Sequence, residues 1–472
     1  MNSAILDELR QEANAKLNPK TKTALGQFMT PSRIAEFMAG LFTNHGEGAR
    51  LLDAGAGIGS LTVAASKVLT LSEIDAWEID PIMRSYLERN LSGLSGEHRI
   101  HAVDFIHDSV ARLANGHMAG FTHAILNPPY KKIATSSEHR LACRQVGIET
   151  VNLYTAFLAL AILHMAPLGE IVIIIPRSFC NGPYYKPFRE LMLEKCSIDH
   201  IHIFESRNKA FEDDQVLQEN IIVKLVRGKP QGPTTLSFSH DATFAEVHER
   251  TVHFDEIVKP KDLHLFIHIP TEVDSNRCQA IFSRTLSEIG LAVRTGPVVD
   301  FRVKAWWSEN PTDQTAPLLY PHHFTPEKFT YPRAHKKPNA LIRSTEVDKW
   351  LMPSGFYVIA KRFSAKEERR RVVAYLVSPS DLEAEMIGFE NHWNVFHVDK
   401  HGMDEETAKG LVCFLNSTQL DDYFRVFSGH TQVNATDLRH MKYPTLAQLR
   451  QLGTTYRYAM PQDEIDDNLD RL

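Results

Sequence analysis

The 472-residue sequence predicts an α/β fold, in which a doubly wound sheet with helices on both faces precedes a C-terminal mixed α+β domain. Short apolar strands alternate with helices over the first half of the chain. A glycine-rich segment joins the first of these strands to the next helix. The segment RGKPQGP at 227–233 then interrupts the pattern, and the periodicity weakens beyond it. We therefore expect one domain over residues 1–230 and a second over residues 235–472.

The elements of the first domain follow from the spacing of its apolar residues. Apolar residues at helical spacing indicate helices within 1–25 and over 32–42, and Pro31 marks the start of the second helix. The alternation then indicates strand 50–53, helix 61–69, strand 74–79, helix 81–91, strands 100–103 and 123–126, helix 153–165, strand 170–175, and two late strands at 199–204 and 220–226. This order is typical of a sheet whose ligand site lies at the carboxyl ends of its strands.

The composition argues against several classes of protein. Hydrophobic residues make up 43% of the chain and charged residues 23%, which are ordinary values for a globular protein. We find no apolar run of 18 residues and no signal peptide, so a membrane span is not expected. The five cysteines form no CxxC pair, which argues against disulfides and a zinc site and favours the reducing cytoplasm.

The charge is unevenly distributed along the chain. The formal net charge of −6 argues against a polyanionic partner, but residues 277–371 carry 17 Lys or Arg against 9 Asp or Glu. The rest of the chain, which includes the acidic tail at 463–470, then carries −14. A local basic segment matters more to a nucleic acid than the net charge. The alternative is an ordinary solvated surface.

Acidic residues follow the first three strands in turn. The segment LLDAGAGIGSLTVAA places Asp53 before a glycine loop, where a carboxylate suits a cationic amine. Glu78 and Asp80 in WEIDP follow the second strand, where an acid can accept hydrogen bonds from ribose hydroxyls. Asp104 in VDFIH follows the third strand and can accept from the amino group of an adenine ring. The set predicts a pocket for an adenosyl group that carries an amino acid, although such acids also occur in α/β folds of other functions.

The tetrapeptide NPPY, Asn127 to Tyr130, follows the fourth strand of the pattern. Its two prolines fix φ and stiffen the loop. The Asn127 side chain and the Pro128 carbonyl can both accept from an exocyclic NH₂ group, and Tyr130 offers a face for stacking. The alternative is a simple proline-rich turn.

In these motifs the sequence resembles the S-adenosylmethionine-dependent amino methyltransferases, and specifically the DNA adenine-N6 methyltransferases of type II restriction–modification systems. The resemblance covers about residues 20–230. The matching motifs, in the order of the gamma class, are GQFMTP (26–31), DAGAGIG (53–59), WEIDP (77–81), VDF (103–105) and NPPY (127–130). A softer match, GHTQVNATDLRHMKYP at 429–444, resembles the end of a target-recognition domain. The resemblance implies a Rossmann-like class I methyltransferase sheet followed by such a domain.

The resemblance also implies roles for particular residues. The residues implied to bind S-adenosylmethionine are Thr30 and Pro31 at the methionine carboxylate, Asp53, Gly55 and Gly57 at the methionine part, Glu78 at the ribose, and Asp104 and Phe105 at the adenine. The residues implied to act on the target base are Asn127, Pro128, Pro129, Tyr130 and a second aromatic, Phe211. Asp80 is the weaker candidate for the ribose, and Phe204, the rival of Phe211, is more typical of a strand core.

The C-terminal half is expected to bind double-stranded DNA. The basic and aromatic stretch 294–371 can lie along phosphates and reach base edges. The candidate contacts are Lys336, Lys337, Arg343, Lys361, Arg362 and the arginines 369–371. The run EERRR at 367–371 is more often a solvated helix face than a DNA contact, and the turn at 428–431 can contact DNA or lie at the surface. Asp300 and Lys304 lack the companion carboxylates of a nuclease, and no histidine spacing indicates a metal.

The function that these motifs predict is site-specific methylation of adenine N6 in double-stranded DNA, with base flipping and S-adenosylmethionine as methyl donor. Such methylation would protect host DNA from a cognate restriction endonuclease, which is a functional rather than a necessarily physical partner. Cys143 and Cys180 lack the context of a cytosine-C5 nucleophile. The alternatives are a methyltransferase for a protein glutamine or RNA, and a non-catalytic nucleic-acid-binding subunit. We expect a monomer.

Overall fold

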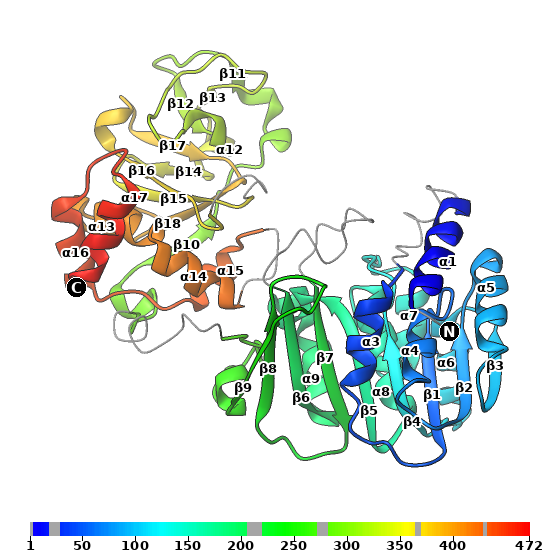
Figure 1. Cartoon of the computed structure of the whole chain (residues 1–472). Coiled ribbons are helices and arrows are strands. Elements are labelled where there is room, and N and C mark those ends of the chain that lie inside the picture. Colours follow the sequence, from blue (N-terminus) through cyan, green and yellow to red (C-terminus); the bar gives the residue numbers. More distant parts are fainter. Residues whose placement is uncertain (1–2, 18–28, 205–219, 271–281, 364–369, 428–431) are drawn as a thin grey trace. The chain divides into compact units, whose positions relative to one another are not determined.

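A nine-stranded sheet forms the centre of the first half of the chain, with strand order β3-β2-β1-β4-β5-β7-β6-β8-β9 (Figure 1). The computed structural model describes residues 3–17, 29–204, 220–270, 282–363, 370–427 and 432–472. The chain divides into two units, Met1–Ile269 and Pro270–Leu472.

The strands of the first unit are β1 (Ala49–Ala54), β2 (Leu71–Trp77), β3 (Glu97–His101), β4 (Phe121–Leu126), β5 (Met165–Pro176), β6 (Cys196–Phe204), β7 (Asn220–Arg227), β8 (Thr234–Ser239) and β9 (Val247–Val252). Its helices are α1 (Ser3–Lys16), α3 (Ser32–Gly40), α4 (Ser60–Ala65), α5 (Pro81–Leu91), α6 (Phe105–Ala114), α7 (Glu138–Gln145), α8 (Leu153–His164), α9 (Lys186–Lys195) and α10 (Phe254–Ile257). Strands β1 to β5 pair in parallel with one another, and β7 is antiparallel to both β5 and β6.

Helices cover both faces of this sheet because successive side chains of a strand point to opposite faces. Leu51 of β1 belongs to a core cluster shared with helices α3, α4 and α5, whereas Leu52 belongs to a cluster shared with α6, α8 and α9. Ile125 and Leu126 of β4 divide in the same way. The prediction of a doubly wound sheet is therefore confirmed.

The parallel strands align their carboxyl ends on one edge of the sheet. Strand β1 pairs with β2 on one side and with β4 on the other, so the chain reverses its direction of winding between β1 and β4. Such a switch point leaves a crevice at the strand ends, where open α/β sheets bind ligands.

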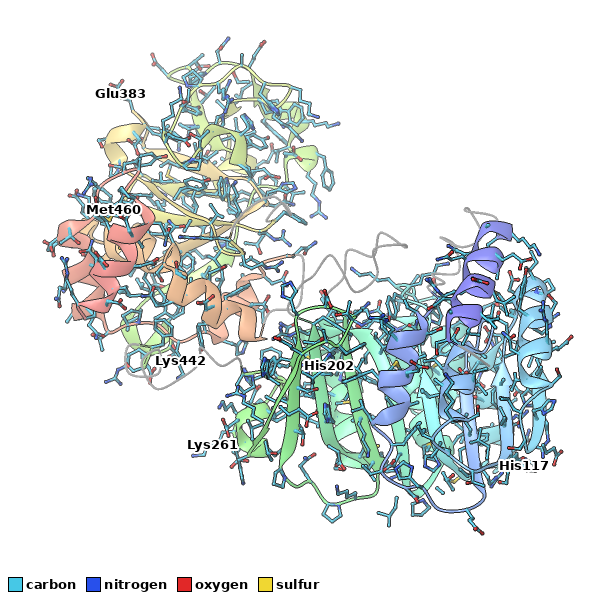
Figure 2. The ribbon with its side chains drawn as sticks, in the orientation of Figure 1. His117, His202, Lys261, Glu383, Lys442 and Met460 are labelled. Carbon is cyan, nitrogen blue, oxygen red and sulfur yellow. The ribbon has the colours of Figure 1, made fainter. Side chains whose placement is uncertain are left out.

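The first unit extends beyond residue 230, the expected end of the first domain. Strand β8 pairs in parallel with β6, and β9 pairs with β8. The buried side chains of His200 and His202 both hydrogen-bond to Ser237 Oγ of β8, at 2.6 and 2.7 Å (Figure 2). These contacts make the segment after the glycine- and proline-rich linker part of the first sheet.

The second unit combines two sheets with a layer of helices. A four-stranded sheet has the order β10-β18-β15-β16, and a five-stranded sheet has the order β11-β13-β12-β17-β14. The strands are β10 (Ala292–Thr295), β11 (Trp307–Ser308), β12 (Thr315–Leu319), β13 (Ala340–Ile342), β14 (Leu351–Pro353), β15 (Tyr357–Lys361), β16 (Ala374–Val377), β17 (Met386–Phe389) and β18 (Trp393–His397). The helices are α12 (Thr345–Asp348), α13 (Glu405–Leu415), α14 (Thr418–Phe427), α15 (Ala435–His440), α16 (Leu446–Thr455) and α17 (Gln462–Asp470).

The core of the second unit lies on both faces of its four-stranded sheet. Val358 and Phe396 pack in a cluster with helices α13 to α17, and Ile359 and Val395 pack in a cluster with residues of the other sheet. This mixed α+β architecture agrees with the predicted class. Within the described ranges of the chain, every helix is too short or too polar to cross a membrane.

Candidate active site

A cavity of about 450 Å³ lies at the carboxyl ends of strands β1 to β4, the edge that contains the switch point. Its volume lies in the range of small-molecule sites. Predicted site residues that line it are Thr30, Gly55, Gly57, Glu78, Asp104, Phe105, Asn127 and Pro129. Segments from four separate strand ends therefore meet in one place, as the order of the motifs indicates.

The glycine loop between β1 and α4 allows a close approach to the cavity. Gly57 has φ of +57°, and a Cβ atom added there would meet nothing within 4 Å, so the backbone itself forms the wall. Gly59 has φ of +85°, and an added Cβ would lie 2.8 Å from Leu87 of α5. The loop therefore requires glycine both for its conformation and for its packing.

Asp53 lies near the end of β1 and is completely buried. Its Oδ2 accepts a hydrogen bond from Thr62 Oγ1 at 2.6 Å, and its Oδ1 has no hydrogen-bond partner among the described residues. Burial, with a smaller contribution from the charge of Glu78, raises the pKa of Asp53 to about 7. A buried carboxylate with an unused oxygen suits a cationic ligand group, because that group would restore the missing partner.

Glu78 and Asp80 have different roles after strand β2. Glu78 lines the cavity, and its two oxygens accept from the backbone N–H groups of Gly57 at 2.8 Å and Asp80 at 2.7 Å. Burial raises the pKa of Glu78. Asp80 instead caps helix α5 by accepting from the N–H groups of Ile82 and Met83. This division agrees with the preference for Glu78 over Asp80 as the ligand-binding acid.

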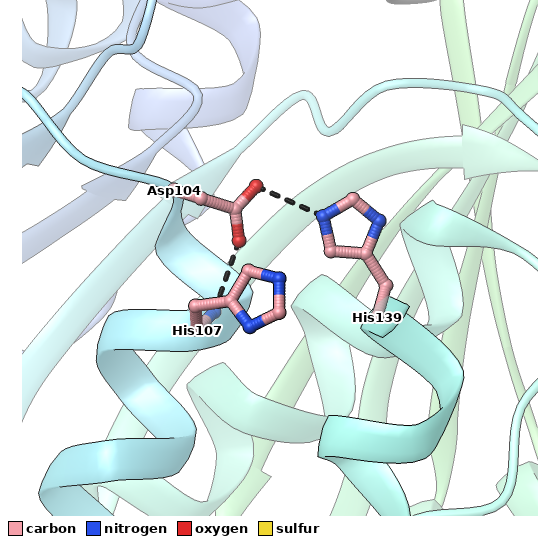
Figure 3. A group of neighbouring side chains, drawn as sticks. All are labelled: Asp104, His107 and His139. Carbon is pink, nitrogen blue, oxygen red and sulfur yellow. Dashed lines mark hydrogen bonds and ion pairs between the residues drawn. The ribbon is translucent and has the colours of Figure 1, made fainter. Parts of the chain in front are cut away.

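Asp104 lies at the start of helix α6 and contacts two histidines (Figure 3). Its Oδ1 accepts from the His107 backbone N–H at 2.9 Å, and its Oδ2 lies 3.1 Å from Nε2 of His139 in α7. Burial raises the pKa of Asp104, but these hydrogen bonds outweigh that effect and lower the pKa overall. Phe105 beside it is buried, with its ring 5.3 Å from Trp77 and 5.0 Å from Phe157.

Side chains rather than backbone groups hold the start of the NPPY loop. Asn127 is buried, and its Nδ2 donates to Thr30 Oγ1 at 2.9 Å. The Tyr130 hydroxyl donates to Asn127 Oδ1 at 2.9 Å and lies 3.2 Å from the carbonyl oxygen of Ile174. Burial raises the pKa of Tyr130. Its ring packs edge-on against Tyr154 at 6.3 Å. These bonds aim the amide oxygen of Asn127 toward Tyr130 and its nitrogen toward Thr30.

Some predicted site residues lie outside the cavity wall. Asp53, Pro31, Pro128 and Tyr130 do not line it. Pro31, Pro128 and Tyr130 each adjoin in sequence a residue that does, whereas Asp53 lies two residues before the lining Gly55. Phe211 lies outside the described residues, as do the residues 26–28 and 428–431. Phe204 is buried in the sheet core, as the sequence pattern indicates for a strand residue.

The wall also contains a segment that the sequence analysis did not assign to the site. Residues 131–134, together with Ser137 and His139, line the cavity after the NPPY loop. Backbone hydrogen bonds from Leu153 to Lys131 and from Ile133 to Val151 fix this segment to the start of α8. The sequence signal for this segment is its position directly after the NPPY motif.

The candidate DNA contacts of the second unit differ in whether their side chains already pair with other groups of the protein. Arg343 pairs with Asp348 at 2.9 Å and with Glu385 at 3.4 Å, and Lys337 pairs with the buried Asp300. Lys336 is exposed, and its side chain takes part in none of the ion pairs between described residues. Lys361 lies over the ring of Tyr375, and Arg362 donates to the carbonyl oxygen of Asn391. Of the arginines at 369–371, residue 369 lies outside the described ranges.

This sheet order, with two strand-end acids, a glycine loop and residues of the NPPY loop lining one cavity, defines a class I methyltransferase. A model of the Eco57I restriction-modification methylase family matches residues 68–211. Type II methyltransferase M.BsuBI of Bacillus subtilis is 47% identical over 99% of this chain and 97% of its own. M.PstI of Providencia stuartii is 40% identical over 98% of this chain and 96% of its own. The chain therefore belongs to the type II methyltransferases of restriction–modification systems.

Solved structures share the fold at low sequence identity. The type IIL restriction-modification enzyme MmeI in complex with DNA has a TM-score of 0.51 and 12% identity, covering 99% of this chain and 73% of that chain. A DrdV–DNA complex has a TM-score of 0.51 and 13% identity, covering 96% of this chain and 59% of that chain. At these identities the likeness concerns the fold.

Proposed function

We propose that this methyltransferase transfers a methyl group from S-adenosylmethionine to the N6 amino group of an adenine in double-stranded DNA at a specific sequence. The observation that carries the proposal is the position of Asn127. Its amide lies in the wall of the cavity that also contains Glu78 and Asp104. Hydrogen bonds to Thr30 and Tyr130 fix that amide as a neutral acceptor.

The residues present fit S-adenosylmethionine. The open backbone at Gly57 admits a close ligand. The unused Oδ1 of Asp53, buried two residues before the lining Gly55, is the acceptor that we propose for the amino group of the methionine part. The Glu78 oxygens each retain a lone pair for a ribose hydroxyl, and Asp104 can accept from the adenine amino group. The cofactor, when bound, supplies an electrophilic methyl group.

The Asn127 side chain and the Pro128 carbonyl would orient the target amino group. The N6 lone pair is delocalised into the adenine ring, so the nitrogen is a poor nucleophile until its hydrogens are held. Two neutral acceptors can hold both hydrogens and direct the lone pair at the methyl group. Catalysis then depends on positioning and fixed dipoles, and no strong base is required because the alkylated nitrogen loses its proton readily.

The target base must leave the duplex to enter such a site, at a cost of a few kcal/mol. Stacking on an aromatic ring returns about 1–3 kcal/mol per base. Tyr130, at the edge of the NPPY loop, is the described candidate for this contact. Its hydroxyl is held by Asn127, so the loop positions acceptor and ring together.

The second unit would select the DNA sequence. Lys336 is the best of the candidate phosphate contacts, because Lys337 and Arg343 already pair with carboxylates. Methylation at the selected site would protect host DNA from a cognate restriction endonuclease. We expect the enzyme to act as a monomer.

The test is methyl transfer from labelled S-adenosylmethionine to mixed genomic DNA, with the product identified by mass spectrometry of the nucleosides. We expect N6-methyladenine. Asn127→Ala should lower the transfer rate by about 10³-fold, the size of effect seen when a preorganised polar contact to the reacting centre is removed. Cofactor binding, measured by calorimetry, should remain.

Asn115→Ala is the matched control, because Asn115 is exposed and lies outside the cavity. Loss of cofactor binding in Asn127→Ala would show that the loop has been misassigned. Label in RNA or protein but not in DNA would instead support the alternative substrates, and cofactor binding without any transfer would support a non-catalytic subunit.

A further inference from the structure

Two histidines and an aspartate converge where helices α6 and α7 begin, beside the cavity (Figure 3). One nitrogen from each of His107 and His139 and one carboxylate oxygen of Asp104 all lie within 4.8 Å of one another. Nε2 of His139 lies 3.1 Å from Oδ2 of Asp104, and the rings of His107 and His139 have centroids 5.1 Å apart. The sequence did not predict this group, because His139 follows the other two residues by more than thirty positions.

The fold holds these side chains together for reasons unrelated to any ligand. Asp104 and His107 are three residues apart at the start of α6, so they share one face of its first turn. His139 lies in the first turn of α7, which packs against α6. The His107 backbone N–H occupies Oδ1 of Asp104 and thereby leaves Oδ2 directed at His139.

Two imidazoles and one carboxylate are a characteristic donor set for a transition metal. Imidazole nitrogen suits Zn²⁺, Co²⁺ and Ni²⁺, whereas Mg²⁺ and Ca²⁺ prefer oxygen ligands. Bonds of about 2.0–2.2 Å to Zn²⁺ place the donors of a tetrahedral site roughly 3.3–3.6 Å apart. Asp104 and His139 are already close to that separation. The exposed ring of His107 needs only a side-chain rotation to join them.

We propose that Asp104, His107 and His139 form a binding site for a divalent transition metal, and that the bound ion excludes the cofactor. Asp104 and His139 line the cavity, whereas His107 does not. An ion held between the two pocket residues occupies the position expected for the adenine amino group. The exclusion rests on the proposed cofactor site, whereas the metal binding does not.

The first experiment measures binding of Zn²⁺ alone to the full chain by calorimetry, after treatment with a chelator. We expect one site, and His107→Ala should weaken it by more than about tenfold, since loss of even an outer-shell partner costs that much. His117→Ala is the control, because His117 is exposed (labelled in Figure 2) and follows the end of helix α6, whereas this group lies at the start of that helix. Thermal melts establish that the variants are folded. Equal Zn²⁺ affinity in the wild type and His107→Ala would overturn the metal site.

The second experiment measures S-adenosylmethionine affinity with and without Zn²⁺. In the wild type Zn²⁺ should raise the apparent Kd in proportion to its concentration, and EDTA should reverse the effect. His107→Ala should bind the cofactor normally, because its side chain is outside the cavity, and should be insensitive to Zn²⁺. Unchanged cofactor affinity in Zn²⁺-loaded wild type would overturn the exclusion. Absence of cofactor binding without Zn²⁺ would contradict the proposed function and leave the metal result standing.

Discussion

The two ends of the cavity differ in charge and in how their polar groups are held. At the end that we propose binds the cofactor, acids follow three strands, and backbone N–H groups hold Glu78 and Asp104. At the NPPY end, the polar groups of Asn127 and Tyr130 are neutral, and the side chains of Thr30 and Tyr130 hold Asn127. Two lysines, Lys131 and Lys132, follow this loop in the cavity wall. We propose that the acidic end binds the cofactor and that Asn127 at the other end orients the target amino group.

The difference matches the chemistry that we propose for each end. A buried carboxylate costs free energy unless a ligand or a hydrogen bond compensates it, so acids at the cofactor end favour a cationic, hydroxyl-rich ligand. A neutral amide cannot take up the proton of an amino group, so Asn127 can hold the target without trapping it. Substitutions at the first end should impair binding or folding, and those at the second end should impair transfer.

The largest effect is expected for Asp53→Asn, on stability. The pKa of Asp53 rises from 3.8 to about 7 on burial, so folding favours the protonated form. The stability that the native fold retains with a protonated Asp53 is fully present below pH 4, and it is lost as pH rises through about 7 and the buried carboxyl ionises. At about 1.4 kcal/mol per pKa unit, the loss approaches 4 kcal/mol at pH 8. Asp53→Asn should therefore raise the free energy of unfolding at pH 8 and leave it nearly unchanged at pH 4.

Urea unfolding of the cofactor-free protein at the two pH values measures this effect. Asp53→Asn should also weaken S-adenosylmethionine binding, since a neutral amide pairs less well with a cationic amine. An equal gain at pH 4 and pH 8 would show that packing, and not charge, is responsible.

The next effect is expected for Glu78→Gln, on cofactor affinity. An amide keeps one acceptor but turns an NH₂ group toward the backbone N–H of Gly57 or Asp80. Loss of a charge-assisted hydrogen bond costs about 1.5–3 kcal/mol. We expect calorimetry to give a Kd for S-adenosylmethionine raised by roughly 10- to 100-fold.

Asp80→Asn is the matched control for Glu78→Gln. Asparagine is also a good N-cap residue, so helix α5 should remain intact and cofactor affinity should change little. A larger loss of affinity in Asp80→Asn than in Glu78→Gln would reverse the assignment of the two acids.

The strand-end acids and the NPPY loop could be predicted because their signals are local in the sequence, and the structure brings Glu78, Asp104 and Asn127 to one cavity. Apolar strands followed by an acid or a glycine loop identify Asp53, Glu78 and Asp104 without knowledge of the fold. The contact between Asp104 and His139 depends on the packing of α7 against α6, and neither helix was assigned from the sequence.

The end of the first domain could not be predicted from local sequence patterns either. Strands β8 and β9 follow a glycine- and proline-rich linker, a typical domain boundary, yet β8 pairs with β6. The hydrogen bond between His202 and Ser237 joins strands that are distant in sequence, and no periodic pattern of residues indicates it. In the second unit, strands as short as Ala340–Ile342 leave too few residues to show alternation.

A smaller effect is expected for Tyr130→Phe, on the rate of transfer. The variant keeps the aromatic ring but removes the hydroxyl that donates to Asn127 Oδ1. A neutral hydrogen bond contributes about 1 kcal/mol, so single-turnover transfer should slow by roughly fivefold. Cofactor affinity should not change. Tyr154→Phe is the control, because its hydroxyl bonds to Ser178 and not to Asn127. A fall in cofactor affinity for Tyr130→Phe would contradict the division between the two ends.

The smallest effect is expected for Thr30→Val, which removes the acceptor of Asn127 Nδ2. Thr30 lines the cavity, so water can replace the lost partner and the cost should stay below about 1 kcal/mol. That cost still matters for orientation, because without this acceptor the Asn127 amide can rotate and present its NH₂ to the target. Single-turnover transfer, measured at saturating cofactor, should slow by about two- to fourfold. Thr30→Ser retains the hydroxyl and should restore the rate. If serine fails to restore it, the methyl group of Thr30, and not its hydrogen bond, positions the loop.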